Sequence, residues 1–311
     1  MNYRRYDSLM RTAMLFLSVL LFQNMLNAED LKVLKERTFA TSTGKELNLE
    51  TATGDIYVSV WDKPEVYVKI SGNKKAAEKL QYKFNSSSSG VSIIVKKESG
   101  FQWLNFGSGM YVKFEVKIPR QYNTSFRTAG GDVKIYNQEG IAKVSTSGGD
   151  ITLINTKCET NSSTSGGDIN VDNNKGNLNL STSGGDINVT GFDGNLSAST
   201  SGGDIKLKGK SGRVSASTSG GDIFLEYDNS SNYGIDLGTT GGDIKVVLPA
   251  DFKANAELGT TGGDIECDHM ITRTRKISHS RFDADLNGGG NKLDCHTTGG
   301  DIKILKKNGA N

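Results

Sequence analysis

The sequence predicts an all-β protein, a flattened parallel β-solenoid (β-helix-like) with about 18 residues per coil and irregular capping strands. Three observations predict it: a Gly-Gly-Asp triplet occurs nine times, its first five steps are each 18 residues, and apolar residues alternate with polar ones after each triplet. Self-similarity at a fixed period is typical of stacked repeats. The nine aspartates are Asp132, Asp150, Asp168, Asp186, Asp204, Asp222, Asp243, Asp264 and Asp301.

Each 18-residue unit contains a second, weaker repeat of nine residues. Glycines from Gly167 to Gly221 recur at that interval, and each is followed by two apolar residues separated by one polar residue. This alternation is typical of half-buried strands, so each unit holds two strands and two turns. The apolar faces must meet, which places the two strands in two sheets whose rungs stack about 4.8 Å apart. A β-sandwich of hairpins is the alternative.

The solenoid makes a specific prediction for the centre of the chain. Residues 128–304 should form stacked parallel strands. One buried column should contain Ile169, Ile187, Ile205 and Ile223.

The Gly-Gly-Asp corner is interpreted first as a structural turn. Glycine allows a positive φ at a tight corner, and Asp accepts hydrogen bonds from nearby backbone N–H groups. Calcium-binding β-rolls use the pattern G-G-x-G-x-D-x-U-x, whereas here Asp follows the glycines directly. Calcium prefers six to eight oxygen ligands, which one Asp per rung does not supply. No cofactor is predicted, and calcium is the only one that the pattern admits.

Residues 1–28 resemble a signal peptide. Arg4, Arg5 and Arg11 supply positive charge, a short apolar run covers residues 13–22, and Ala28 offers a small residue for cleavage. The apolar run is about half of the ~20 residues that a membrane span needs, and no other stretch is long enough. The sequence therefore predicts a secreted protein, periplasmic or on the cell surface, without a transmembrane span after signal removal. An uncleaved N-terminal anchor is the alternative.

The charge of the remaining chain is balanced. Removing residues 1–28 takes three Arg and one Asp, which leaves 37 − 3 = 34 basic and 35 − 1 = 34 acidic residues. Nucleic-acid binding needs a basic face, so no nucleic-acid partner is predicted.

The irregular ends divide the chain further. Residues 29–127 are expected to form a β-rich start and cap of the solenoid, with strands in 47–62, 65–71, 91–97 and 110–119 and one or two helical turns in 73–80. Residues 128–265 form the regular repeat, and 266–311 an insertion and a C-terminal coil.

Any specific site should lie where the repeat breaks, because the central rungs repeat one another. One candidate is an aromatic loop that contains Phe101, Trp103 and Phe106, since exposed aromatics are common contact anchors. The alternative is that these rings cap the open end of the solenoid. The second candidate is a basic cluster in the insertion that contains Arg273, Arg275 and Arg281. Such a cluster could bind an anionic glycan or head group, or be a merely solvated surface.

The three cysteines do not form a disulfide framework. Cys267 and Cys295 fall on interior positions of opposing strands, which leaves open either a disulfide or two buried thiols. A disulfide needs Cα atoms within about 7 Å, closer than the usual 10 Å between packed sheets. Cys158 stands at a turn-glycine position and has no evident partner.

Four segments carry a resemblance to a known family. They are GDIYVSVWDKPEVYV, VKIPRQYNTSFRTAGGDVKI, LPADFKANAELGTTGGDI and LNGGGNKLDCHTTGGDIKI. From about residue 37 onward, the chain resembles the bacterial putative-adhesin family of β-strand-repeat proteins, a domain of unknown function. The resemblance implies a β-helix-like fold, export and no known catalytic residues. The chain departs from the family in its regular 18-residue centre.

Three function classes remain after this reading. No catalytic motif such as H-E-x-x-H, G-x-S-x-G or a P-loop occurs, so the protein is predicted not to be an enzyme. The first class is an exported, adhesin-like surface-binding scaffold of the cell envelope, which fits the long faces of a solenoid. The second is a structural or sensory envelope protein that binds another protein. A polysaccharide-active β-helix enzyme is the third. The expected partner is a cell-surface glycan or an envelope protein.

Overall fold

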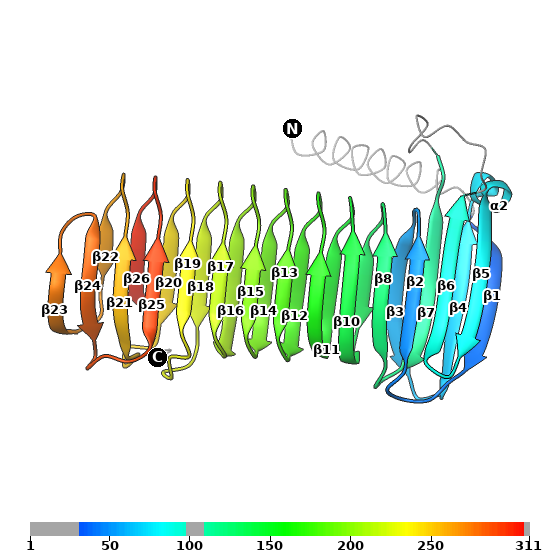
Figure 1. The fold of residues 1–311 in the computed structure, drawn as a ribbon, viewed down its shortest axis with the longest axis horizontal. Coiled ribbons are helices and arrows are strands. Elements are labelled where there is room, and N and C mark those ends of the chain that lie inside the picture. Colours follow the sequence, from blue (N-terminus) through cyan, green and yellow to red (C-terminus); the bar gives the residue numbers. More distant parts are fainter. Residues whose placement is uncertain (1–30, 98–108, 308–311) are drawn as a thin grey trace, which may run out of the picture.

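The computed structural model describes residues 31–97 and 109–307, which form an elongated stack of coils (Figure 1). Each coil contributes one strand to each of two facing sheets, named here sheet A and sheet B. The all-β parallel solenoid predicted from the repeat is confirmed. The predicted signal peptide (residues 1–28) and the predicted aromatic loop with Phe101, Trp103 and Phe106 lie outside the described residues.

Sheet A runs from the N-terminal end of the stack to the C-terminal end. Its strands, in spatial order, are β1 (Lys32–Ala40), β4 (Glu65–Gly72), β7 (Val112–Pro119), β3 (Asp55–Trp61), β9 (Val133–Tyr136), β11 (Ile151–Ser163), β12 (Ile169–Lys175), β14 (Ile187–Asp193), β16 (Ile205–Ser211), β18 (Ile223–Tyr227), β20 (Ile244–Leu248), β26 (Ile302–Lys306) and β22 (Ile265–Cys267).

Sheet B faces sheet A and shares β11 with it, because β11 continues through a corner. Its strands, in spatial order, are β5 (Leu80–Ser87), β6 (Gly90–Lys97), β2 (Glu46–Thr51), β8 (Asn123–Thr128), β10 (Glu139–Thr146), β11, β13 (Leu178–Ser181), β15 (Leu196–Ser199), β17 (Val214–Ser217), β19 (Ile235–Gly238), β25 (Lys292–His296), β21 (Ala254–Gly259), β24 (Arg281–Leu286) and β23 (Ile271–Ile277).

The predicted apolar column is confirmed. Ile169, Ile187, Ile205 and Ile223 pair directly in parallel register and are at most 1% exposed. The column follows from the period of two along each strand, which sends every second side chain into the space between the sheets. Identical side chains therefore stack on one another through the centre of the molecule.

The N-terminal end mixes parallel and antiparallel pairing. β4 pairs antiparallel with both β1 and β7, and β5 pairs antiparallel with β6. The predicted helical turns in 73–80 are confirmed as α2 (Lys74–Lys79), which begins where Asn73 accepts a hydrogen bond from the Ala76 N–H. Asn is a favoured N-cap because its side-chain oxygen satisfies a free N–H of the first turn.

The C-terminal coil does not follow the chain order that the sequence implied. β25 lies between β19 and β21, and β26 lies between β20 and β22. The last coil is therefore inserted between two earlier ones. The insertion also contains antiparallel pairs, β21 with β24 and β24 with β23, so the prediction of parallel strands throughout 128–304 is wrong there.

The interpretation of the glycine pair also needs correction. Among the described Gly-Gly-Asp triplets, only Gly131 has its φ (133°) in the left-handed region. In the others, the second glycine is needed for close approach: a Cβ on Gly203 would lie 2.2 Å from the carbonyl oxygen of Gly185 in the preceding rung. The first glycine is less constrained, since a Cβ on Gly202 would come no closer than 3.5 Å to any such atom.

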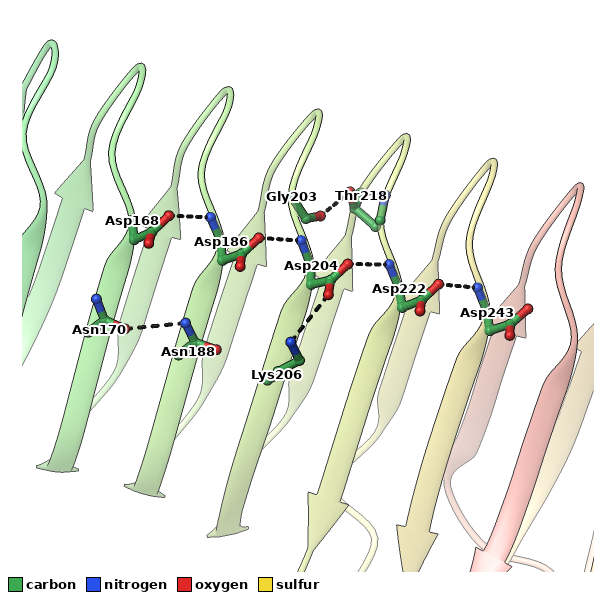
Figure 2. A network of polar contacts seen from close by, with 11 residues as sticks. Asp168, Asn170, Asp186, Asn188, Gly203, Asp204, Lys206, Thr218, Asp222 and Asp243 are labelled. Atoms are coloured by element: carbon green, nitrogen blue, oxygen red, sulfur yellow. Dashed lines mark hydrogen bonds and ion pairs between the residues drawn. The ribbon is translucent and has the colours of Figure 1, made fainter. Parts of the chain in front are cut away.

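A ladder of aspartates runs along this corner, as predicted for a structural turn (Figure 2). The Oδ1 atom of each Asp accepts a hydrogen bond from the backbone N–H of the Asp on the next rung, for example Asp186 from Asp204 at 2.8 Å and Asp204 from Asp222 at 3.0 Å. In space the ladder starts at Asp55 and ends in the order Asp243, Asp301, Asp264. The carboxylates thus join the rungs.

A buried threonine completes each corner. The Thr218 hydroxyl donates to the Gly203 carbonyl at 2.9 Å and accepts from the Gly221 N–H at 3.4 Å. The hydroxyls of Thr164, Thr182 and Thr200 make the equivalent pairs of contacts. We call this corner, with its Thr, Gly-Gly and Asp residues, the Gly-Gly-Asp edge.

The other corner of each coil, here the opposite edge, is built differently. Its turn residues do use positive φ, as in Asn173 (57°), Gly176 (124°) and Gly194 (149°). Its interior column changes along the stack from buried polar residues, among them Gln138 and Asn174, to buried aromatic ones. The aromatic members are Phe192, Tyr227 and Phe252, whose rings lie 6.1–6.4 Å apart.

Candidate functional site

The outer face of sheet A carries a row of side chains that runs along the solenoid axis. Direct strand pairing connects Tyr57 to Lys134, Lys134 to Thr152, and so on along the stack. We call this the axial row; in order it contains Lys69, Glu115, Tyr57, Lys134, Thr152, Asn170, Asn188, Lys206, Phe224, Lys245, Lys303 and Glu266. Because rungs are about 4.8 Å apart, the row offers evenly spaced contacts to an extended ligand.

Aromatic side chains gather at the N-terminal end of this face. Tyr57 and Trp61 come from β3, Tyr67 from β4 and Tyr136 from β9, and all four are partly exposed. Their outward direction follows from the strand period, because Ile56, Val58 and Val68 between them point into the core. Tyr57, Tyr67 and Tyr136 line a shallow pocket of about 340 Å³.

Lysines from adjacent strands lie over these rings. The Lys113 Nζ is 4.8 Å from the centre of the Tyr57 ring, and the Lys117 Nζ is 5.8 Å from Trp61 and 5.9 Å from Tyr67. These distances are within the range of cation–π attraction. We call Tyr57, Trp61, Tyr67 and Tyr136, with Lys113, Lys117 and Lys134, the aromatic–lysine surface.

Hydrogen bonds and ion pairs hold this surface in place. The Tyr67 hydroxyl donates to Glu36 Oε1 at 2.8 Å, which raises the pKa of Tyr67, and the Trp61 indole N–H donates to the Glu65 carbonyl at 2.8 Å. Lys69 pairs with Glu115 at 2.9 Å, and this contact lowers the pKa of Glu115. Rings fixed in this way lose little conformational entropy when a ligand binds.

One lysine of the surface has no carboxylate partner. In the part of the chain that the structure describes, no ion pair involves Lys117, whereas Lys113 and Lys134 pair with Glu115 and Asp132. The Lys117 ammonium group therefore keeps hydrogen-bond donors for a ligand lying across Trp61 and Tyr67.

The basic cluster predicted in the insertion is partly paired with carboxylates. Arg275 is held by two carboxylates, Asp283 at 2.5 Å and Asp285, and these contacts raise the pKa of Arg275. Arg273, on the same strand β23, is exposed. Arg281 is exposed on β24 beside a polar pocket of about 440 Å³. Arg275 is thus occupied by carboxylates while Arg273 and Arg281 are exposed, and binding of an anionic ligand by this cluster stays a prediction.

The cysteines are all free thiols in the structure. Cys267 lies on β22 of sheet A and Cys295 on β25 of sheet B, and burial raises the pKa of both thiols. Cys158 is buried in β11, and desolvation raises its pKa to about 12. Thiols with raised pKa values are poor nucleophiles. Cys267 and Cys295 are therefore two separate thiols in the structure and do not form a disulfide.

Within residues 31–97 and 109–307, no group of three or more His, Cys, Asp or Glu side chains is arranged to hold a metal ion. In the Asp ladder, one oxygen of each bonded carboxylate already accepts a backbone N–H, as in Asp186 and Asp204. The same described part of the chain contains no helix long and apolar enough to cross a membrane.

Sequence reasoning did not find the aromatic–lysine surface. Its strands are predicted from the sequence, but its four rings come from three separate strands. Tyr57 and Lys134 are 77 positions apart in the chain yet adjacent in the sheet. The usable signal was the period-two alternation in 55–61 and 65–71, which leaves Tyr57 and Tyr67 on the outward side.

The fold and this surface define a β-solenoid with an exposed aromatic and basic face. The chain matches the Toastrack DUF4097 family over residues 44–305, and it belongs to that family. No curated protein matches the chain.

Three solved structures resemble this one. A putative adhesin from Bacteroides fragilis NCTC 9343 is 14% identical, with 87% of this chain and 96% of that chain covered and a TM-score of 0.38. A putative cell adhesion protein from Clostridium sporogenes ATCC 15579 is 13% identical, with 88% and 99% covered and a TM-score of 0.22. A putative lipid binding protein from Parabacteroides distasonis ATCC 8503 is 14% identical, with 87% and 96% covered and a TM-score of 0.37.

Proposed function

We propose that the protein is an exported, non-catalytic, adhesin-like scaffold of the bacterial cell envelope that binds a cell-surface glycan on the outer face of sheet A. Export is inferred from the signal-peptide character of residues 1–28. The single observation that carries the binding proposal is the aromatic–lysine surface, where four partly exposed rings and three lysines lie on one rigid face.

The chemistry of this surface fits a sugar chain. The flat faces of pyranose rings are apolar and stack on aromatic side chains, while the hydroxyl groups require hydrogen-bond donors and acceptors nearby. Tyr57 and Tyr67 supply the apolar ring faces, and Lys117, Ser59 and Glu115 supply the hydrogen-bonding groups along the wall of the same pocket. Aromatic residues also carry a large share of the binding energy at protein surfaces.

The charges favour a neutral or weakly charged glycan. Lys69 and Lys113 share the single carboxylate of Glu115, and Lys134 pairs with Asp132. With Lys117, four lysines therefore face two carboxylates, which leaves a modest excess of positive charge that suits a neutral or weakly acidic sugar chain. Beyond it, the axial row continues with Asn170 and Asn188, whose amides donate and accept hydrogen bonds. An extended chain could therefore lie along the axis with its rings at the N-terminal end.

A glycan array with the secreted chain tests this proposal. Binding to a defined set of neutral or weakly charged glycans is expected, and Tyr57→Ala should weaken it by about 2 kcal/mol, or about thirty-fold. The matched control is Asn179→Ala on the outer face of sheet B, which should leave the affinity unchanged. Loss of binding in both variants, or no glycan binding at all, contradicts the proposal.

The alternative is a structural or sensory envelope protein whose partner is another protein. Binding of a purified envelope protein that survives Tyr57→Ala and competes with no glycan would favour this alternative.

A further inference from the structure

A hollow of about 420 Å³ opens along the opposite edge, on the outer side of sheet A. It is lined mainly by residues of β11, β12, β14 and β16, which lie in the middle of the stack (Figure 1). The turn residues of these coils recur every 18 positions, as Asn155, Asn173, Gly191 and Gly209. Asn173 Nδ2 donates to Asn155 Oδ1 at 3.2 Å, whereas the next two coils carry no side chain at this position.

A shift of register accompanies the change from asparagine to glycine. β14 and β16 pair out of step at Phe192, which lies opposite Gly209. The Phe192 ring occupies the place of a side chain there, because a Cβ on Gly209 would lie 2.2 Å from it. Likewise, a Cβ on Gly191 would lie 2.3 Å from Asn173 Oδ1. Glycine backbone therefore forms part of the wall of the hollow.

Most of the charged groups that line the hollow already have a partner. The pairs are Lys157 with Glu139 at 2.8 Å, Lys208 with Glu226 at 3.1 Å, Lys210 with Asp193 at 3.7 Å, and Asp228 with Lys307. Among the described residues, no ion pair involves Lys175, and no hydrogen bond involves the Thr190 hydroxyl or Asn173 Oδ1. The hollow therefore keeps an ammonium group, a hydroxyl group and an amide oxygen available to a ligand.

A row of outward side chains connects the hollow to the aromatic–lysine surface. Tyr136 pairs with Ile154, Ile154 with Asp172, and Asp172 with Thr190, all in parallel register. Three rungs separate Tyr136 from Thr190, a distance of about 14 Å. A sugar chain that lies along the axis from the aromatic–lysine surface therefore reaches the hollow over this row.

We propose that this hollow is a second sugar subsite, which binds one residue of an extended glycan that also covers the aromatic–lysine surface. This inference rests on the proposed function and adds a requirement for chain length, because a bound chain must span about 14 Å to occupy both sites. The volume of the hollow lies within the range of small-ligand pockets. Lys175, Thr190 and Asn173 supply the hydrogen bonds to the hydroxyl groups of the sugar.

A sugar residue fits the hollow better than a free anion does. Asp193 and Asp228 line it together with the lysines, so an anion would meet two carboxylates of its own sign. The hydroxyl groups of a sugar donate hydrogen bonds to carboxylates and accept them from ammonium groups. The mixed lining therefore favours a ligand with many hydroxyl groups.

The dependence of affinity on chain length tests this inference. The probes are three series of oligosaccharides: β-1,4-linked glucose, β-1,4-linked N-acetylglucosamine and α-1,4-linked galacturonate. Each series covers lengths below and above the span of about 14 Å. In at least one series, affinity should rise about tenfold once the chain spans both sites, which is the gain expected from about two added hydrogen bonds.

Two variants remove the polar groups of the hollow at exposed positions. Lys175→Met with Thr190→Val replaces both donors by apolar groups of similar shape, and Asn173→Gly removes the amide but keeps the positive φ. Either variant should lose most of the rise with length and keep the affinity of the parent for the shorter chains. Lys143→Met with Ser197→Ala makes a matched change on the outer face of sheet B and should alter neither affinity.

The outcomes separate this inference from the proposed function. Equal affinity for short and long chains, or a rise that both hollow variants retain, overturns the second subsite, while binding that depends on Tyr57 still supports the proposed function. If no series binds, the second subsite fails and the glycan array decides the proposed function by itself. If Tyr57→Ala leaves short-chain binding unchanged, both proposals fall together.

Discussion

The two corners of each coil form their turns through different interactions. At the Gly-Gly-Asp edge, every coil from Thr200–Asp204 to Thr297–Asp301 keeps the same five-residue spacing and the same bonds between rungs. At the opposite edge, the connection lengthens from 212–213 to 228–234, and interior residues change from Asn174 to Phe192 and Tyr227.

The opposite edge also has bonds between rungs, such as Arg213 N–H to Asn195 Oδ1 at 2.9 Å and Asn173 Nδ2–H to Asn155 Oδ1 at 3.2 Å, but these do not recur at every rung. A bond that recurs at every rung keeps the turn at one length, whereas the opposite edge accommodates turns of different lengths.

Substitution of the second glycine of a Gly-Gly-Asp corner should have the largest effect on stability. Gly203→Ala should reduce the free energy of unfolding by about 3 kcal/mol, because the new Cβ would overlap the Gly185 carbonyl oxygen of the neighbouring rung. Its neighbour provides the control: Gly202→Ala should stay within about 0.5 kcal/mol of the parent chain. Urea denaturation followed by circular dichroism measures both. Equal losses in the two variants would contradict the assignment of close approach to the second glycine.

The buried threonine should have the next largest effect. Thr200→Val keeps the shape but removes the hydroxyl that donates to Gly185 and accepts from Gly203, which should cost about 2 kcal/mol. Thr200→Ser restores the hydroxyl and should recover most of that loss. Thermal unfolding of the three chains distinguishes them, and a Val variant as stable as the parent would show that the threonine does not join the rungs.

The opposite edge should respond to backbone conformation instead. Asn173 has a φ of 57°, so Asn173→Ala should lose about 1 kcal/mol from left-handed strain. Asn173→Gly should be close to neutral, because glycine adopts this conformation freely. The denaturation midpoints of the two variants are the measurement. If Asn173→Gly lost as much stability as Asn173→Ala, the loss would come from the side-chain contact with Asn155. That result would contradict the assignment to backbone strain.

The Asp ladder should make a small, pH-dependent contribution to the free energy of unfolding. The backbone N–H of Asp222 and then Lys206 lower the pKa of Asp204 in the folded protein. Its contribution is therefore present above the unfolded value of about 3.9 and is lost as pH falls through the lower folded pKa. It should stay below about 1 kcal/mol, since the side chain is 38% exposed.

Asp204→Asn checks the sign of this effect. Between about pH 5 and pH 2, the parent should lose more unfolding free energy than the Asn variant, which keeps an acceptor oxygen but no titrating group. A parent chain whose pH dependence matches that of the Asn variant would exclude a charged ladder at this rung.

The periodic part of the fold was predictable because each of its rules is local. Ile169 and Ile187 are inward by the strand period, and equal step lengths align them in register. The helical turns at Lys74–Lys79 were likewise predictable from their own residues and the Asn73 cap. The role of the second glycine was misread, because its constraint comes from a carbonyl 18 residues away and not from its own φ.

The sequence by itself therefore determined the repeat, the two-sheet solenoid, the buried column and the position of the Asp ladder, since all of them depend on residue type and spacing along the chain. Only the tertiary structure decided the order of the last coils, because the segments 260–264 and 297–301 have the same Thr-x-Gly-Gly-Asp spacing, and this spacing does not say which coil pairs with β19 and β20. The tertiary structure also assembled the aromatic–lysine surface, whose residues are distant in the chain. Sheet pairing across β4, β7, β3 and β9 brings them together, and strand order in a sheet is set by contacts that no local pattern records.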